Sequence, residues 1–211
     1  MSLGLIGRKL RMTRIFSDQG ESLSVTAIQA GPCPIVSVKD GNGDGEKVLQ
    51  LGYGELKEDK VTKPQAGHFK KAKVAPCRIL KEFRVAGSEK ADELKAGGTV
   101  TVEMFNEGER VNIRARSKGK GFMGVVKRHG FRTREKTHGQ SDRLRAPGSI
   151  GQSSYPSRVW KGMKMAGKTG DRWTTTRNLE VVKVLKEENV ILVKGAVPGT
   201  SNNHLIIKKL S

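Results

Sequence analysis

Short stretches in which apolar and polar residues alternate occur near both ends of the chain. They are rich in β-branched residues, and turn-forming runs such as DGNGDGE (40–46) and GAVPGTSNN (195–203) separate them. Alternation with a period of two residues between turns is typical of a small antiparallel sandwich or barrel. We therefore expect strands at residues 23–29, 34–38, 47–53, 99–105, 179–185, 189–195 and 204–210.

Two further local predictions follow from this pattern. LEVVKVL and VILVKG flank the turn KEEN (186–189), which indicates a hairpin. SEKADELKAGG (88–98) is the one predicted helix, with Ser88 as its N-terminal cap and Gly97 at its end.

The stretch between the two groups of predicted strands has a different composition. From Arg114 to Arg177 there are 17 Lys+Arg and three acids, a net charge of +14, whereas the other 147 residues carry a net charge of +5. Leu, Ile, Val and Phe make up about 11% of it, below the roughly 20% at which a segment builds its own core. Strands from both flanks are needed to complete one barrel. We therefore interpret 1–113 and 178–211 as one discontinuous β-barrel domain. The interpretation of 114–177 is a basic extended loop inserted between strands, which is not an independent domain.

The charge of the whole chain points to a polyanionic partner. Its formal net charge is +19 and its sequence pI is about 10.2. No apolar run approaches the ~20 residues that a membrane span needs, and the first residues lack the apolar core of a secretory signal. Cys33 and Cys77 suggest no disulfide framework. We expect a cytoplasmic RNA-binding protein without a membrane partner.

Residues Gly119–Gly124 match GxGxxG, the fingerprint of dinucleotide-binding sites. The context argues against that use, because 112–118 is not a buried apolar strand and no amphipathic helix is predicted to follow. Glycines here would instead let backbone amides and lysines approach phosphates closely.

Catalysis, metal binding and cofactor binding have little support in the sequence. The four histidines form no pair at metal-ligand spacing, and the basic segment holds only three acids, Glu135, Asp142 and Asp171. We expect no enzymatic activity, no cofactor and no small-molecule substrate. Two rival interpretations remain, a nucleotide-using or RNA-modifying enzyme built on GxGxxG and a general nucleic-acid chaperone.

The basic segment supplies the candidate RNA contacts. Its aromatic residues stack on unpaired bases or on guanidinium planes, or they form small local clusters, and the sequence leaves these alternatives open: Phe122, Phe131, Tyr155, Trp160 and Trp173. We expect RNA to contact Arg114, Arg116, Lys118, Gly119, Lys120, Gly121, Lys127, Arg128, Arg132, Arg134, Arg143, Arg145, Arg158, Lys161 and Lys164.

Several motifs in the same order resemble the ribosomal protein L3 (uL3) family of the large subunit, in its bacterial form. The local signature is Phe105, Asn112, Ala115, Ser117, Gly119-Lys120-Gly121, Gly124 and Arg128. The longer motifs are GRKLRMTRIF near the start, AGPCPIV (30–36), KPQAGHFKKA (63–72), RAPGSIGQ (145–152), WKGMKMAG (160–167) and LVKGAVPG (192–199).

This resemblance implies a barrel of the translation-protein type and a loop that extends through ribosomal RNA toward the peptidyl transferase centre. It also implies a structural role in translation, early ribosome assembly, and contacts with ribosomal RNA and neighbouring large-subunit proteins. The loop tip would comprise Gly148, Ser149, Ile150, Gly151, Gln152 and Ser153. Gln152 matches a glutamine that is methylated in some bacteria.

Overall fold

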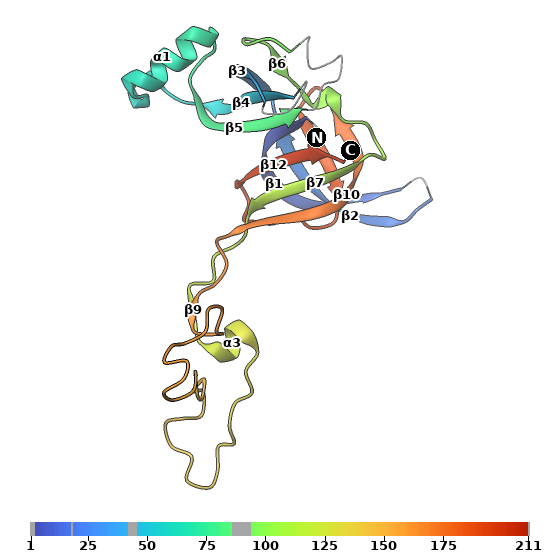
Figure 1. The fold of residues 1–211 in the computed structure, drawn as a ribbon. Coiled ribbons are helices and arrows are strands. Elements are labelled where there is room, and N and C mark those ends of the chain that lie inside the picture. Colours follow the sequence, from blue (N-terminus) through green and yellow to red (C-terminus); the bar gives the residue numbers. More distant parts are fainter. Residues whose placement is uncertain (1–2, 18, 42–45, 86–93, 211) are drawn as a thin grey trace. The chain divides into compact units, whose positions relative to one another are not determined.

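The computed structural model describes residues 3–17, 19–41, 46–85 and 94–210. It is mainly β and contains two compact units (Figure 1). Unit 1 comprises 1–117 and 173–211, and unit 2 comprises 118–172. Each unit is described by itself below.

Unit 1 is built on a closed barrel of six strands. Every neighbouring pair is antiparallel, and the ladder returns from the last strand to the first. In order around the barrel the strands are β1 (Gly4–Phe16), β12 (His204–Lys209), β7 (Arg110–Arg116), β10 (Trp173–Leu185), β11 (Val190–Lys194) and β2 (Ser22–Ala30).

Strand β7 shows how the sequence specifies this barrel. Val111, Ile113 and Ala115 are fully buried, while Arg110, Arg114 and Arg116 face outward and are exposed. Successive side chains of a strand point to opposite faces, so a strand with one buried face can carry an arginine at alternate positions. The register is therefore fixed by burial on one face only.

A four-stranded sheet lies beside the barrel in unit 1 (Figure 1). The largest apolar cluster joins the two, because it contains barrel residues such as Ile113 and sheet residues such as Phe83. In order, the sheet strands are β5 (Cys77–Val85), β4 (Lys47–Glu55), β3 (Cys33–Asp40) and β6 (Thr99–Val100).

Helix α1 (Lys63–Ala72) packs on this sheet through Phe69 and Ala72, which contact buried Val36. Thr62 and Gln65 form a capping box at its start. Two short 3₁₀ turns, η1 (Glu58–Lys60) and η2 (Val102–Met104), complete unit 1.

Most of the predicted strands are confirmed. Strands β2, β3 and β4 span their predicted segments, β11 and β12 match theirs to within one residue at each end, and β10 with β11 forms the predicted hairpin. The strand predicted at 99–105 is wrong beyond Val100, because the chain turns into η2 there. Strands β1, β5 and β7 and helix α1 were not predicted. In the helix predicted at 88–98, residues 94–98 are not helical, and 88–93 lie outside the described residues.

The ends of the predicted extension belong to the barrel. Residues 114–116 lie in β7 and residues 173–177 lie in β10, and the two segments pair with each other, with Trp173 opposite Arg116. Charge composition placed the boundary at 114 and 177, but exposed arginines also occur on the outer face of a strand.

Unit 2 has little regular structure. Strands β8 (Phe122–Met123) and β9 (Gly167–Lys168) pair, and α3 (Val125–His129) is a five-residue helix. Residues 130–166 contain no helix or strand.

We expect unit 1 to fold when residues 118–172 are replaced by a short Gly/Ser linker. The pairing of Arg116 with Trp173 already brings the two cut ends together, and unit 1 has its own apolar core. Circular dichroism should show a β spectrum and a cooperative thermal transition. Adding Ile113→Asp, which places a charge in that core, should abolish the transition. A disordered spectrum of the linker variant would show that unit 2 is needed for folding.

Candidate nucleic-acid interface

Unit 2 combines high positive charge with almost complete exposure. Its 55 residues include 14 Lys+Arg and three acids, a net charge of +11. Across residues 118–172, all of which the structure describes, only Val125 is buried. The cations of this segment are therefore accessible from solvent.

The base of unit 2 is a narrow two-stranded ladder, which we call the neck (residues 118–124 and 165–171). The Lys120 N–H donates to the Thr169 carbonyl at 2.8 Å, and the Thr169 N–H donates to the Gly121 carbonyl at 2.9 Å. Beyond these bonds, β8 pairs with β9. The GxGxxG motif thus takes part in a β-ladder.

Two glycines on the second strand of the neck, Gly167 and Gly170, lie close to neighbouring groups that a side chain would meet. Gly170 has a φ of +77°, and a Cβ there would overlap the Lys118 carbonyl oxygen. A Cβ on Gly167 would lie 2.6 Å from Nη1 of Arg128, the end of a flexible side chain. Only Gly170 therefore meets a rigid neighbour.

Helix α3 connects the two sides of the neck through Arg128. Its Nη1 donates to the Met165 carbonyl at 2.7 Å, and His129 Nε2 lies 3.0 Å from the same oxygen. Gly130, with a φ of 72°, ends the helix in the left-handed region. Arg128 was predicted as an RNA contact, and the structure also gives it a role in holding the neck.

The structure places most predicted contact residues in unit 2. Arg114 and Arg116 are the exceptions, since they lie on the outer face of β7 in unit 1. The remaining cations are all exposed: Lys118, Lys120, Lys127, Arg128, Arg132, Arg134, Arg143, Arg145, Arg158, Lys161 and Lys164.

The aromatic side chains of the basic segment are mostly exposed. Phe122 is 75% and Tyr155 is 85% exposed, so these two form no local apolar cluster. Trp160 is 52% exposed, with the Arg158 guanidinium 4.7 Å from its ring centroid. Phe131 is half-buried, with its ring 6.2 Å from that of His129. For Phe122, Tyr155 and Trp160 the structure favours availability for stacking over local packing.

The predicted loop tip, 148–153, is exposed throughout. Ser149 Oγ donates to the Gly151 carbonyl at 2.9 Å, which closes a tight turn. Gly148–Gln152 and Ser157–Val159 line a hollow of about 500 Å³. Since Gln152 is exposed at this hollow, its side-chain amide can meet an external partner.

The dinucleotide site lacks its structural context. A helix does follow GxGxxG, contrary to our expectation, but α3 has only five residues. The strand before the motif, β7, is buried on one face, which the sequence analysis also missed. The motif lies in the ladder of the neck. Since α3 has only five residues, a pyrophosphate would have no helix N-terminus of useful length to bind.

Neither cysteine is an activated thiol, and the described residues offer no metal centre. Burial raises the pKa of Cys33 to about 12, and burial together with Glu55 raises the pKa of Cys77. Neither cysteine forms a disulfide, and the raised pKa values disfavour the thiolate form of both. No group of three or more His, Cys, Asp or Glu in the described residues could hold a metal ion. No helix among those residues has the length and apolarity to cross a membrane.

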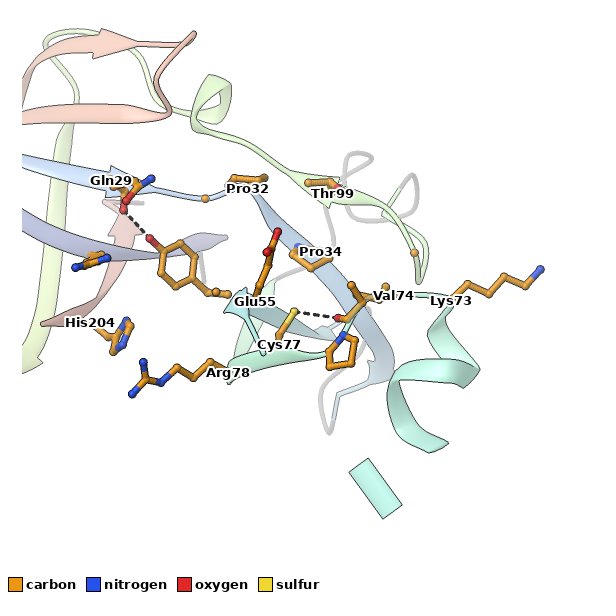
Figure 2. Close-up of a pocket in the computed structure, with 17 residues that line it drawn as sticks. Gln29, Pro32, Pro34, Glu55, Lys73, Val74, Cys77, Arg78, Thr99 and His204 are labelled. Carbon is orange, nitrogen blue, oxygen red and sulfur yellow. Dashed lines mark hydrogen bonds between the residues drawn. The ribbon is translucent and has the colours of Figure 1, made fainter. Parts of the chain in front are cut away.

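Sequence reasoning missed a group of residues in unit 1. Arg8, Arg78 and His204 come from three separate strands, and they line a cavity of about 700 Å³ with Tyr53 and Glu55 (Figure 2). Beside them, Trp173 lies near Lys81 and Arg114, with cation-to-centroid distances of 5.6 and 5.4 Å. Neither β1 nor β5 alternates clearly enough in sequence to reveal this convergence.

Comparison with known proteins gives consistent results. Residues 78–190, more than half of the chain, match the family model described as ribosomal protein L3. Large ribosomal subunit protein uL3 of Chlorobaculum parvum is 54% identical over 203 residues, which is 96% of each chain. The Chlorobaculum tepidum protein of that name is 53% identical over the same shares. The Herpetosiphon aurantiacus protein is 48% identical over 98% of this chain and 95% of its own.

Gly170→Ala should loosen the neck, whereas Gly124→Ala, where a Cβ meets nothing within 4 Å, should leave it intact. A left-handed conformation costs an L-residue about 1–2 kcal/mol, before any clash with Lys118. Hydrogen exchange at the Lys120 and Thr169 amides, which report the neck ladder, should accelerate roughly tenfold in Gly170→Ala. Equal exchange rates in the two variants would contradict this account of the neck.

Proposed function

This chain belongs to the ribosomal protein L3 family, and we propose that it binds ribosomal RNA directly, mainly through unit 2. As a member of this family it is a structural constituent of the large ribosomal subunit and not an enzyme. The same membership places it on the cytoplasmic ribosome of a bacterium.

The exposure of unit 2 is the observation that carries this proposal. Fixing each backbone residue costs roughly 1–2 kcal/mol, and one buried side chain in 55 residues offsets little of it. Seven of the eleven large apolar side chains described as exposed also lie in unit 2. RNA supplies phosphates for the cations and base faces for the aromatic rings, so it matches both properties.

The proposed contacts divide by chemistry. Lysines such as Lys118 and Lys120 would neutralise phosphates, and Gly119 and Gly121 would allow the RNA backbone to approach the neck. Exposed rings such as Tyr155 and Trp160 would stack on unpaired bases. The contacts with RNA phosphates would supply most of the affinity, and the stacked bases would fix the position of the RNA.

The loop tip, 148–153, would lie near the peptidyl transferase centre. The support is the family membership together with the exposure of the tip and of Gln152. There the protein would act indirectly, by stabilising one arrangement of nearby nucleotides, while the RNA performs the reaction. Gln152 is the candidate methylation site.

The remaining proposals concern unit 1 and assembly. We infer that the closed barrel is of the translation-protein type and that the segment inserted in it extends into RNA as a loop. The chain would join the subunit early in assembly and would contact neighbouring large-subunit proteins. A general RNA chaperone would instead bind many RNAs equally well, so co-sedimentation with the large subunit at high salt separates the two functions.

RNA affinity should depend steeply on salt through unit 2. If six to ten phosphates are neutralised, affinity for a large-subunit RNA transcript should fall roughly 10³–10⁵-fold between about 50 and 200 mM salt. Lys118→Gln, Lys120→Gln and Lys127→Gln together should reduce the log–log slope by about 2–3. Three exposed lysines of unit 1, Lys57, Lys60 and Lys186, form the matched control. An equal loss of slope in the control would assign the interface elsewhere.

Deleting residues 149–154 should leave incorporation into the subunit nearly intact, because the neck and most cations remain. It should change peptide-bond formation or sensitivity to drugs that bind the peptidyl transferase centre. Mass spectrometry of protein from native subunits should find a methyl group on Gln152. Deleted subunits that match wild type in both functional assays would show that the tip is an inert turn.

A further inference from the structure

The cavity in unit 1 that Arg8, Arg78 and His204 line has cationic groups at one end. It has a volume of about 700 Å³ and is lined by residues of β1, β2, β3, β4, β5, β6 and β12 and by the segment after α1 (Figure 2). Its charged and titratable lining groups are Arg8, Glu55, Lys73, Arg78, Tyr53, Cys77 and His204. We call it the barrel cleft.

One end of the barrel cleft is cationic. Figure 2 shows Arg78 beside His204, Glu55 beside Cys77, and Lys73 at the far side pointing away from the rest. Burial, then the positive charges of Arg78 and Arg8, lower the pKa of His204, and all three residues line the barrel cleft. Arg8 donates its Nε–H to Asn202 at 3.1 Å, and the structure gives Arg78 no hydrogen bond or ion pair with a described residue. Arg8, Arg78 and His204 thus line one cleft, and the carboxylate of that cleft, Glu55, lies beside Cys77.

A second hollow continues from this end. It has a volume of about 270 Å³, shares His204 with the barrel cleft, and is lined by Lys81, Arg116 and Trp173. The Trp173 side chain is 44% exposed and carries Lys81 and Arg114 near its ring. Cations and an exposed indole thus follow one another across β5, β7, β10 and β12.

We propose that the barrel cleft and this second hollow form an RNA-binding site separate from unit 2, which takes a short single-stranded segment. Arg8 and Arg78 bind one phosphate, since guanidinium forks match phosphate oxygens. Trp173 stacks on a nearby base, and Lys81 and Arg116 neutralise the next phosphate. An acidic peptide would satisfy the arginines but has no base to stack on the exposed part of Trp173, so charge and aromatic chemistry together favour RNA. This site does not depend on RNA binding by unit 2.

Histidine NMR of the full-length protein tests the two sites separately. His204 reports the barrel cleft, His129 and His138 report unit 2, and His68 on α1 is an internal reference. The probe is a single-stranded uridine hexanucleotide, with inorganic phosphate and a hexaglutamate peptide as separate additions. A phosphate between Arg8 and Arg78 cancels charge that lowers the pKa of His204. The hexanucleotide should therefore raise that pKa toward its ordinary value, and phosphate should do so only at far higher concentration.

The matched variants are Arg8→Gln with Arg78→Gln, and Arg14→Gln with Arg84→Gln. Each pair removes one exposed arginine from β1 and one from β5. On each strand the control arginine lies six residues after the arginine of the cleft. The first pair should raise the pKa of His204 in the free protein and weaken the hexanucleotide effect at His204 at least about tenfold, as expected for two lost charge-assisted contacts. The second pair should change neither.

Three results would overturn the site. The hexanucleotide could shift His129 and His138 while leaving His204 unchanged, which would leave unit 2 as the RNA-binding part. Hexaglutamate could act on His204 more strongly than the hexanucleotide, which would identify a protein partner. The two arginine pairs could also weaken the effect of the hexanucleotide on His204 equally, which would indicate a general electrostatic attraction and not a specific site. Shifts at His204 with none at His129 or His138 would support the barrel cleft and count against the proposed function of unit 2.

Discussion

The pairing of β7 with β10 is the constraint on which the other features depend. The chain leaves the barrel after residue 117 and returns at Trp173, directly opposite Arg116. Closing a loop of 55 residues costs about 3.5 kcal/mol in chain entropy on a (3/2)RT ln n scale. The buried face of β7, with Val111, Ile113 and Ala115, offsets this cost within the barrel core. The inserted segment therefore needs no core of its own to have its two ends held together.

This arrangement separates the source of stability from the source of binding. Unit 1 has a continuous apolar core that joins the barrel to the second sheet, whereas unit 2 has one buried residue. In unit 2, the neck ladder, which includes the pairing of β8 with β9, and the Arg128 contact with Met165 fix only the base. Under the proposed function, RNA would supply further contacts to the segment past the neck. Folding and RNA binding would then be coupled in unit 2 and independent in unit 1.

The sequence predicted the strands in which apolar residues are frequent and alternate clearly with polar ones. It did not predict elements in which charged residues obscure that alternation. Strands β11 and β12 were found because apolar residues dominate VILVK and HLIIKK. The second half of strand β7, Arg114–Arg116, was assigned to the basic extension, because its outward arginines dominate its composition while Ala115 contributes little hydrophobicity. Helix α1 was missed because KPQAGHFKKA buries only two residues. The cations of unit 2 could be identified from charge alone. The barrel cleft could not, because Arg8, Arg78 and His204 meet only once the barrel and the sheet have packed.

The charged outer strand of the second sheet has a consequence for the newly made protein. Strand β5 pairs only with β4, so its other side is an open edge among the described strands, while the barrel has none. Open edges are templates for pairing between molecules, and charged side chains along an edge discourage it. The sequence CRILKEFRV carries Arg78, Lys81, Glu82 and Arg84 along that edge. Before the protein joins the large subunit, these charges discourage self-association into extended intermolecular sheets.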